Sequence, residues 1–453
     1  MLTHLQIRNF KAWAQTQGIR LAPLTVFFGS NSSGKSSLNQ LLLMLKQTVQ
    51  SQDRRIVFHL GDKTSVIELG TFWDIVHAHQ DNERIAFELE WQLAKEKEIK
   101  NRFSNQTFKG NFIKFSAEMG LPGGHRQDMV VHQMSYQLGE PSQTRLKVQM
   151  KREEKAAQKD SYSLTAFPSH LLPTQSASLP HPIHFYGFPS EVTTQYENAD
   201  FVYDLALALE KRLQNIYYLG ALREPPQRYY IRSGEIPESV GWRGERAVDA
   251  ILAASDQMIS PFEAMIADWL KKMGLIESFE IKPIAPKRRD YEVLVKTLAL
   301  TDQVNLTEVG FGISQVLPVL VQCFYAPVGS TTIIEQPEVH LHPSAQAVLA
   351  DLFIEALSAK DDKGSNRNIQ LIIESHSEHF LRRLQRRIAE QKIRPSDTAI
   401  YFCEMSASGS ILKPLEIDDY GNINNWPDKF FGDELGDITA MTEAAIQRRT
   451  QSN

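Results

Sequence analysis

Apolar and polar residues alternate at the start of the chain, and this alternation predicts a β-strand over residues 2–10. The short apolar run at 24–28 (LTVFF) predicts a second, buried strand. Directly after it, residues 37–49 carry apolar side chains at helical spacing. The chain therefore opens with strands that lead straight into a helix.

The pattern changes at about residue 84, where short alternating segments replace the longer apolar runs. Gly, Pro, Asn and Ser separate these segments, as is typical of turns between antiparallel strands. Two charged runs in this region, 95–100 and 151–159, mix both signs and are more typical of solvated edges than of binding sites. We predict strands at 84–93, 111–118, 129–138, 144–150 and 182–186.

Strands and helices alternate in the C-terminal half, after helical patterns at 200–216 and 247–275. Alternation of this kind is typical of a parallel sheet covered by helices. The sequence thus predicts an α/β fold with a mixed or parallel sheet, flanking helices and an antiparallel β-rich insertion. The alternation runs through strand 291–297, helix 312–324, strand 331–335, helix 343–356, strand 369–373, helix 377–391 and strand 398–403.

The composition of the 453 residues, 42% hydrophobic and 23% charged, is that of a folded chain rather than a disordered one. Two cysteines, Cys323 and Cys403, cannot form a disulfide framework, which favours a reducing cytoplasm. The longest apolar stretch, 316–328, is interrupted by Pro318 and Gln322 and is too short to span a bilayer. We expect a cytoplasmic protein without a membrane segment. The net charge of −5 argues against a general polyanion binder.

Residues 29–36 (GSNSSGKS) match the phosphate-binding loop G-x-x-x-x-G-K-[ST] and lie between a predicted strand and a predicted helix. Glycines permit a tight loop whose backbone N–H groups point at phosphate oxygens, and the helix N-terminus adds positive charge. Lys35 is expected to neutralise phosphate oxygens, and the Ser36 hydroxyl to join the Mg²⁺ shell. The predicted nucleotide-binding residues here are Gly29, Ser30, Asn31, Ser32, Ser33, Gly34, Lys35, Ser36 and Ser37.

An apolar strand that ends in a carboxylate, 331–335 (TTIIE), provides the second signal. Glu335 is the candidate Mg²⁺ ligand, directly or through water, although an ordinary strand-end glutamate is the alternative. His340 and His342 lie two residues apart, but no third ligand stands at a recognisable spacing, which favours structural or surface histidines over a metal pair. His376 follows the strand at 369–373. Its place after the other two motifs favours contact with a γ-phosphate over a structural role.

Together, the three motifs resemble the ATP-binding-cassette (ABC) type of ATPase head found in RecF, Rad50, SMC and the OLD nucleases. The resemblance implies ATP and Mg²⁺ as cofactors, and a homodimer in which ATP is sandwiched between two heads. Residues 306–315 (LTEVGFGISQ) stand where the signature motif of this family opens a helix. The residues implied to close over the partner's nucleotide are Gly310, Gly312, Ser314 and Gln315.

A closer resemblance is to the standalone ATPases of prokaryotic anti-phage systems, the group that includes Septu PtuA. It is carried by residues 223–226 (REPP), 241–245 (GWRGE), 309–320 (VGFGISQVLPVL), 335–343 (EQPEVHLHP) and the tail at 417–431. The resemblance implies a sensor or scaffold subunit, in a homodimer or higher oligomer, that controls a separate nuclease. A DNA or phage component is a further expected partner.

Two departures from the family pattern bear on catalysis. Gln336 stands where these ATPases usually carry a glutamate that polarises the attacking water, and an amide cannot accept a proton. We therefore expect slow ATP hydrolysis unless Glu338 or a partner supplies the base, since general-base help is worth about 10²–10⁴-fold. The signature is also irregular, with Gly310 where a serine is usual, so backbone N–H groups at the Gly312 helix would make the γ-phosphate contact.

The stretch after His376 is too short to add a nuclease domain, so we expect no nuclease activity of the chain itself. The alternative function is a RecF-like repair ATPase that binds DNA through basic side chains on and after one helix and in a loop at 287–289. The helix residues are Arg382, Arg383, Arg386, Arg387, Lys392 and Arg394. The same arginines could instead pair with carboxylates or pack at a protomer interface. An ABC transporter subunit is a weak third reading. We expect an ATPase head built from 1–90 and 200–413, an insertion lobe at 91–199 and a tail module at 414–453.

Overall fold

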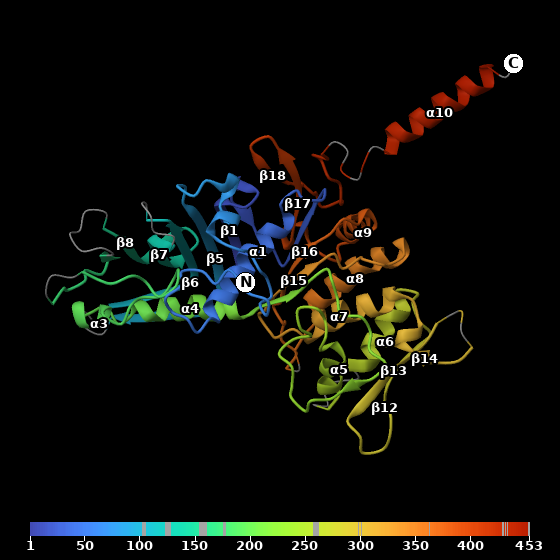
Figure 1. The fold of residues 1–453 in the computed structure, drawn as a ribbon, viewed down its shortest axis with the longest axis horizontal. Coiled ribbons are helices and arrows are strands. Elements are labelled where there is room, and N and C mark those ends of the chain that lie inside the picture. Colours follow the sequence, from blue (N-terminus) through green and yellow to red (C-terminus); the bar gives the residue numbers. More distant parts are fainter. Residues whose placement is uncertain are drawn as a thin grey trace.

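In the computed structural model, an eight-stranded antiparallel sheet, a mostly parallel central sheet and a smaller antiparallel sheet follow one another along the molecule, with helices packed against them (Figure 1). The structure describes residues 1–101, 106–122, 128–153, 161–174, 178–256, 262–297, 299, 301–361, 363–427, 430, 432 and 434–451. No helix in these ranges is long and apolar enough to cross a membrane.

The first sheet is antiparallel and has eight strands, in the order β2-β1-β5-β6-β7-β8-β9 with β3 on the other end of β1. Alternate side chains such as Phe87, Leu89 and Trp91 are buried in one core, while the residues between them point to the opposite face. The strands are β1 (Leu2–Phe10), β2 (Trp13–Gln15), β3 (Ile19–Arg20), β5 (Ile85–Asn101), β6 (Gln106–Gly120), β7 (Val130–Glu140), β8 (Gln143–Arg152) and β9 (Tyr162–Phe167).

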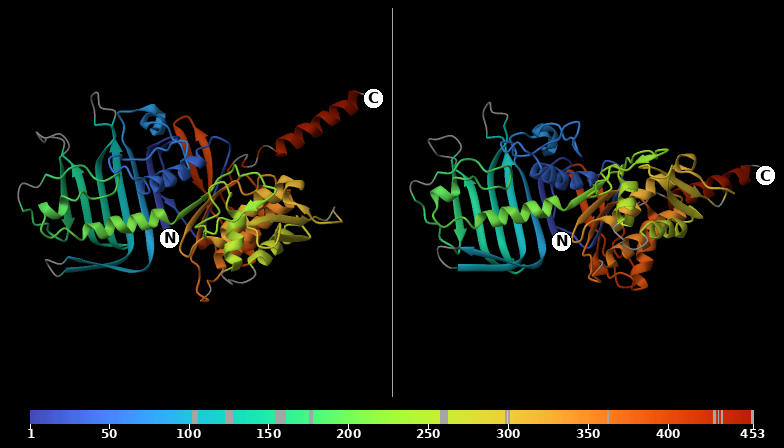
Figure 2. Two further views of the ribbon diagram at one scale, coloured as in Figure 1. Left: turned by 60° about the horizontal axis from the view of Figure 1, so that its bottom comes forward. Right: turned by 90° about the horizontal axis from the view of Figure 1, so that it is seen from below.

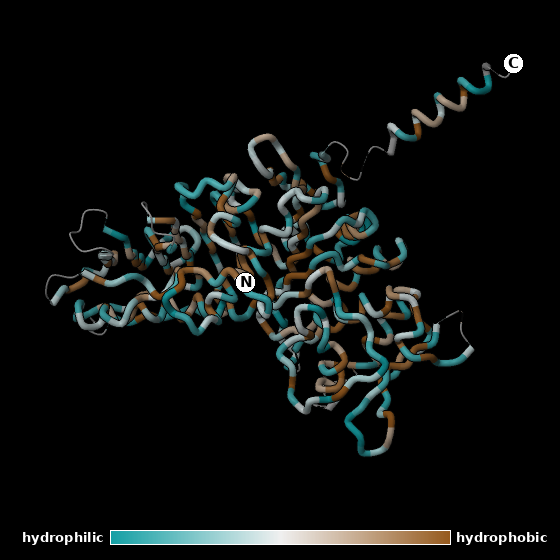
Figure 3. The backbone as a smooth tube through the Cα atoms, in the orientation of Figure 1, coloured by the Kyte–Doolittle hydropathy of each residue, from teal (hydrophilic) through white to brown (hydrophobic). Residues whose placement is uncertain are grey.

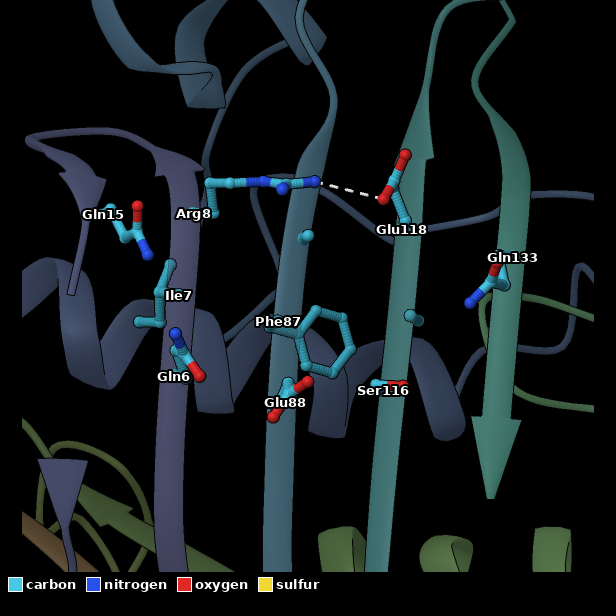
Figure 4. A pocket seen from close by; sticks show the side chains of 11 residues that line it. Gln6, Ile7, Arg8, Gln15, Phe87, Glu88, Ser116, Glu118 and Gln133 are labelled. Carbon is cyan, nitrogen blue, oxygen red and sulfur yellow. Dashed lines mark hydrogen bonds and ion pairs between the residues drawn. The ribbon is translucent and has the colours of Figure 1, made fainter. Parts of the chain in front are cut away.

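The outward face of this sheet is polar, and Figure 4 shows its shallow pocket along β1, β5, β6 and β7. Arg8 and Arg84 both form ion pairs with Glu118, at 3.1 and 2.8 Å. Antiparallel sheets commonly leave one such face to solvent. We refer to Arg8, Arg84 and Glu118 as the sheet-face ion pairs.

The second sheet has the order β10-β15-β16-β4-β17-β18, and all of its pairs are parallel except β17–β18. Its strands are buried on both faces: Phe27 of β4 packs into one core cluster, while Val26 and Phe28 pack into the other. The strands are β4 (Leu24–Gly29), β10 (Ile216–Leu219), β15 (Thr331–Glu335), β16 (Gln370–Glu374), β17 (Thr398–Ser406) and β18 (Gly409–Pro414).

Helices cover both faces of the parallel sheet, and the views of Figure 2 show α4 running on from the antiparallel lobe toward it. The apolar strands of the parallel sheet appear brown at the centre of the molecule in Figure 3. The helices are α1 (Lys35–Val49), α4 (Val202–Gln214), α7 (Phe311–Tyr325), α8 (Pro343–Ser358) and α9 (Glu378–Ala389). A third, four-stranded antiparallel sheet and two more helices pack beside α7: β11 (Tyr230–Ile231), β12 (Ser278–Pro283), β13 (Asp290–Lys296), β14 (Val304–Asn305), α5 (Ala247–Asp256) and α6 (Phe262–Lys272).

The tail returns to the parallel sheet before it leaves the body. The Phe430 ring lies 4.6 Å from the Phe402 ring, 5.7 Å from the Phe28 ring and 5.2 Å from the Trp426 ring. After this aromatic contact, α10 (Glu434–Gln451) projects away from the rest of the molecule (Figure 1). Short helices fill the connections: α2 (Phe72–Ile75), η1 (His77–His79), α3 (Val192–Gln195), η2 (Leu306–Glu308) and η3 (Pro395–Asp397).

The α/β fold with an antiparallel β-rich region is confirmed, and four of the five predicted insertion strands correspond to β5 to β8. The prediction of a strand at 182–186 is wrong, because this segment makes only an isolated bridge between Ile183 and Gly187. The predicted helix at 247–275 is two helices, α5 and α6. The expected boundary between residues 90 and 91 falls inside β5, which pairs with β1, so the first sheet continues from the N-terminal strands into the insertion.

Candidate functional site

The loop between β4 and α1 has the backbone that a phosphate-binding loop requires. Gly29 has φ 145°, and a Cβ atom there would lie 2.1 Å from the carbonyl oxygen of Cys403. Gly34 has φ 89°, and a Cβ atom there would lie 2.5 Å from the Ser410 hydroxyl. Only glycine fits both positions, since each combines a left-handed backbone with close approach of a neighbouring strand.

Lys35 folds back over this loop. Its Nζ atom donates to the carbonyl oxygens of Gly29 at 3.0 Å and Ser30 at 2.7 Å. Burial lowers the pKa of Lys35, and the nearby Glu374 carboxylate opposes that shift. The Trp13 indole donates to Ser37 Oγ at 2.9 Å and so ties the start of α1 to the antiparallel sheet. Lys35 and Trp13 thus fix the conformation of the phosphate loop and of the start of α1.

Two carboxylates face the loop from the ends of neighbouring parallel strands. Glu335 of β15 and Glu374 of β16 are direct register partners. The Ser36 hydroxyl donates to Glu374 Oε1 at 3.0 Å, whereas Glu335 Oε1 accepts from the Asn39 amide at 3.4 Å. The sequence predicted Ser36 and Glu335 as the metal pair, but the carboxylate that Ser36 contacts is Glu374.

Burial and mutual repulsion disfavour the charged forms of these acids. Burial, helped by the Glu374 charge, raises the pKa of Glu335 to about 7, against hydrogen bonds from Tyr218 and Asn39. Burial also raises the pKa of Glu374, although the Lys35 charge and the Ser36 hydrogen bond oppose the shift. A nearby cation would favour both charged forms.

The donor set fits a Mg²⁺ ion that arrives with a nucleotide. The second carboxylate oxygen of Glu374 is buried and has no hydrogen-bond partner among the described residues. Within the same ranges, no group of three or more His, Cys, Asp or Glu side chains is arranged to hold a metal ion by itself. Mg²⁺ usually takes one or two carboxylates, a hydroxyl and phosphate oxygens, which is what Ser36, Glu335 and Glu374 would supply beside a triphosphate.

Gln336 lies directly after Glu335 with a left-handed backbone, at φ 44°. Its N–H donates to the carbonyl oxygen of Glu374 at 2.8 Å. From the other side, the Arg223 guanidinium donates to the carbonyl oxygens of Glu335 at 2.9 Å and Gln336 at 3.4 Å. Arg223 is buried, and two of its nitrogens have no partner among the described residues. This clamp fixes the turn that carries Gln336.

Glu338 and His376 meet through the backbone. The His376 N–H donates to Glu338 Oε1 at 2.6 Å, and Glu338 is only 7% exposed. Burial raises the pKa of Glu338, although the hydrogen bond from His376 opposes the shift. Burial lowers the pKa of His376, and the Lys35 charge lowers it further, which favours a neutral imidazole. The structure thus brings His376 to the Lys35 side of the site, while Glu338 braces the turn before α9.

The predicted signature residues, Gly310 to Gln315, lie at the start of α7 rather than at the phosphate loop of the same chain. A Cβ atom on Gly312 would lie 2.9 Å from the carbonyl oxygen of His340, so the start of α7 packs on the loop that follows β15. Ser314 and Gln315 are buried, and Ser314 Oγ donates to the Phe311 carbonyl oxygen at 2.9 Å. Gly310 immediately precedes this helix, and Phe311 is 63% exposed. The described contacts of this segment are with its own Gln336–His342 loop rather than with its own phosphate loop.

The remaining sequence candidates have structural partners. His342 caps the N-terminus of α8 by accepting from the Ser344 N–H at 3.3 Å. The arginines of α9 are ion-paired within the chain: Arg383 and Arg387 with Asp351, Arg386 and Arg387 with Glu390, and Arg382 with Glu378. These pairs match the prediction of a helix face neutralised by carboxylates.

Sequence reasoning missed Glu374, Arg223 and Asn39 as members of the site. Glu374 ends an apolar strand just as Glu335 does, and this shared pattern is the signal that could have found it. Arg223 and Asn39 carry no comparable signal, because only the folded chain brings them to the carboxylates.

Comparisons with known proteins agree with this geometry. A family model described as "AAA ATPase domain" matches residues 1–170 and 242–381, and one described as "Protein of unknown function (DUF3696)" matches residues 393–441. No curated protein matches the chain. Among solved structures, the chain is similar to an SMC head bound to the C-terminal winged-helix domain of ScpA, with 13% identity, a TM-score of 0.43 and coverage of 92% of this chain and 98% of that one.

It is similar also to the SMC head domain from Thermotoga maritima, with 12% identity, a TM-score of 0.41 and coverage of 92% and 99%. The family match includes the phosphate loop, Glu335 and His376, the residues that the fold gathers at one end of the parallel sheet. The chain therefore belongs to the AAA ATPase domain family.

Proposed function

We propose that the chain binds ATP with Mg²⁺, hydrolyses it slowly and uses the bound state to control a separate effector. The observation that carries the proposal is the convergence of the glycine loop, Lys35 and two carboxylates, one buried and one partly buried, at the ends of β4, β15 and β16. When bound, Mg²⁺ would polarise the phosphate oxygens.

The side chains divide the work of binding. Backbone N–H groups of the loop and the α1 N-terminus would hold the phosphates, with Lys35 released from the carbonyl oxygens of Gly29 and Ser30 to neutralise them. Ser36 and Glu335 would contact the metal ion. A neutral His376 would donate one hydrogen bond to the γ-phosphate and so report whether it is present.

Slow turnover follows from Gln336. An amide can orient a water molecule but cannot take its proton. Glu338, the other candidate base, already accepts from the His376 backbone through one oxygen and is almost fully buried. A long-lived ATP state would suit a switch better than a motor.

The signature segment would act in a second copy of the chain. The segment that carries Gly310, Gly312, Ser314 and Gln315 contacts His340 of its own chain through Gly312 and the Phe311 ring. The exposed Phe311 ring marks the same face. In a homodimer with two sandwiched ATP molecules, the start of this helix would close over the partner's γ-phosphate, and higher oligomers could form from such dimers.

The sequence resemblance to standalone anti-phage ATPases supports a controlling role beside a nuclease in a cytoplasmic defence complex. Direct DNA binding of the RecF kind is the alternative, and a phage component could serve as the trigger in either case. We favour the controlling role because the α9 arginines, the best support for a DNA track, are neutralised within the chain.

ATP hydrolysis and molecular mass in solution test the biochemical part of the proposal. Wild-type protein should hydrolyse ATP at a slow, measurable rate and shift from monomer to dimer by light scattering when ATP and Mg²⁺ are added. Lys35→Ala should lose both properties while keeping the circular dichroism spectrum. Hydrolysis that persists in Lys35→Ala would contradict the site assignment.

Phage plating tests the controlling role. Cells that express the chain together with its neighbouring gene should restrict phage, whereas either gene alone, or the pair with Lys35→Ala, should not. Purified chain should leave plasmid DNA intact in Mg²⁺ or Mn²⁺. DNA cleavage by the chain alone would contradict the separate effector, and a recombination defect without phage restriction would favour the repair alternative.

A further inference from the structure

Glu374 occupies the centre of the site although no motif marks it. It ends β16, the strand that lies between the phosphate-loop strand β4 and the Glu335 strand β15. In register it stands beside Phe27 on one side and Glu335 on the other. The parallel sheet therefore presents this carboxylate closer to the phosphate loop than Glu335, by one strand.

Only one of the two carboxylate oxygens of Glu374 has a hydrogen-bond partner among the described residues. One carboxylate oxygen accepts from the Ser36 hydroxyl at 3.0 Å, while the other is buried and has no hydrogen-bond partner among the described residues. The residue is only 4% exposed. A buried carboxylate oxygen without a partner is costly, so a group that supplies positive charge at this point would be bound favourably.

The cationic side chains near Glu374 donate their described hydrogen bonds to backbone carbonyl oxygens. Lys35 Nζ donates to the carbonyl oxygens of Gly29 and Ser30, and it must turn toward phosphates when a nucleotide binds. Arg223 reaches the carbonyl oxygens of Glu335 and Gln336. A divalent cation bound beside the Ser36 hydroxyl would complete the coordination of Glu374.

The other two acids are held by groups outside the phosphate loop. Glu335 accepts from Asn39 at 3.4 Å and from Tyr218. Glu338 is tied to the His376 backbone at 2.6 Å. Glu374 is thus the acid with a described hydrogen bond to Ser36, the serine whose equivalent in phosphate loops joins the Mg²⁺ shell.

We infer that Glu374, with Ser36, would hold the Mg²⁺ ion that accompanies ATP, and that Glu335, which accepts from Asn39, would be the second carboxylate available to it. The inference rests on the proposed ATP binding. It moves the principal metal carboxylate from the strand that the family motif marks to the strand beside it.

Glu374→Gln tests the inference because it removes the charge and keeps the shape. Without a divalent metal, the Glu374 carboxylate repels the triphosphate, so the variant should bind ATP in EDTA at least as tightly as wild type. With the non-hydrolysable analogue AMPPNP bound, its affinity for Mn²⁺, followed by the electron paramagnetic resonance signal of free Mn²⁺, should fall at least about tenfold. A merely structural role would weaken both kinds of binding together.

Glu404→Gln is the matched control. Glu404 lies near the end of β17, on the other side of β4, and its carboxylate pairs with Lys413 at 2.6 Å. This variant should keep wild-type affinity for both ATP and Mn²⁺. Glu374→Asp, which keeps the charge but shortens the side chain, should lie between wild type and Glu374→Gln, and it serves as the second variant if the glutamine variant does not fold.

Each outcome decides the question. If the AMPPNP complex of Glu374→Gln binds Mn²⁺ with wild-type affinity, the metal role of Glu374 is overturned and ATP binding still stands. If only Glu374→Asp folds, wild-type Mn²⁺ affinity in the AMPPNP complex of that variant has the same meaning. A wild-type chain that binds no ATP, with or without metal, overturns the proposed function and this inference together.

Discussion

Carboxylates occur in two very different settings in this molecule. On the outward face of the antiparallel sheet, Glu118 is partly exposed and pairs with Arg8 (Figure 4) and with Arg84. At the end of the parallel sheet, the partly buried Glu335 and the buried Glu374 are register neighbours. Lys35 lies near Glu374, and Arg223 lies near Glu335. In the first setting, the carboxylate has its charged partners within the chain. In the second, two acidic side chains lie side by side, and one carboxylate oxygen of Glu374 has no hydrogen-bond partner among the described residues.

The difference teaches where to look for function. Matched surface ion pairs contribute little to stability and need no ligand. Buried like charges with an unpartnered oxygen are unfavourable in the isolated chain, and a phosphate-bound cation would relieve them. Both sheets have a polar feature at their surface, but only the parallel one is incomplete without a ligand.

The largest expected effect concerns turnover at Gln336. Gln336→Glu restores a group that can accept the proton of the attacking water, so the rate of ATP hydrolysis at saturating ATP should rise about 100-fold or more. The control is Gln336→Asn, which keeps an amide and should stay at or below the wild-type rate. Turnover unchanged by Gln336→Glu would sink this explanation of slow hydrolysis.

A matched pair of glycines tests the geometry of the phosphate loop. Gly34→Ala and Gly274→Ala both place a Cβ atom on a left-handed residue, which costs about 1–2 kcal/mol in each case. A Cβ atom on Gly34 also meets Ser410 at 2.5 Å, while Gly274 faces open space. Calorimetric titration should show ATP binding at least tenfold weaker in Gly34→Ala and unchanged in Gly274→Ala. Equal affinities would contradict the tight fit of the loop.

The pH dependence of stability should have opposite signs in the two regions. Since the pKa of Glu335 is raised to about 7 in the folded chain, its ionisation destabilises the fold above that pH. This penalty shrinks as the pH falls below 7 and is gone below about 4.5, where the unfolded chain is protonated as well. Urea unfolding of nucleotide-free protein should therefore show that Glu335→Gln gains more stability relative to wild type at pH 8 than at pH 5. A gain independent of pH would contradict the raised pKa.

Glu118→Gln provides the smallest and opposite effect. Partial burial opposes the shift, but Arg84 and Arg8 hold the pKa of Glu118 below its ordinary value. The ion pairs thus stabilise the fold above the pKa of the unfolded carboxyl and lose that contribution as the pH falls through the folded pKa. The variant should lose at most about 1 kcal/mol of unfolding free energy at pH 8, and less at low pH. Any change in its ATP affinity would contradict the separation of the two regions.

Local patterns predicted much of the fold and part of the site. Strand 331–335 and the helices around it follow from apolar runs of the right length, and the loop at 29–36 follows from its glycines and Lys35. These signals are local because side-chain periodicity, helix hydrogen bonds and the backbone of a phosphate loop are set within a few residues. Their functional roles stay predictions until nucleotide binding is measured.

The rest depends on which strands become neighbours. The contact between Ser36 and Glu374 exists because β16 lies beside β4, and no spacing in the sequence encodes that order. Pairing of β1 with β5 likewise joins the N-terminal strands to the predicted insertion, although β4 and α1 lie between them in the sequence. The α9 arginines read as a basic patch in sequence, yet Asp351 from α8 neutralises two of them.

Calorimetric titration of ATP with Mg²⁺ into wild-type protein and Lys35→Ala tests the central claim most directly. The claim predicts saturable binding by wild type and a loss of at least about 100-fold in ATP affinity for Lys35→Ala, because removal of the ammonium group would leave several phosphate oxygens without a charged donor. Equal affinities in the two proteins, or no binding by the wild type, would contradict the claim that the incomplete charges at the end of the parallel sheet form a nucleotide site.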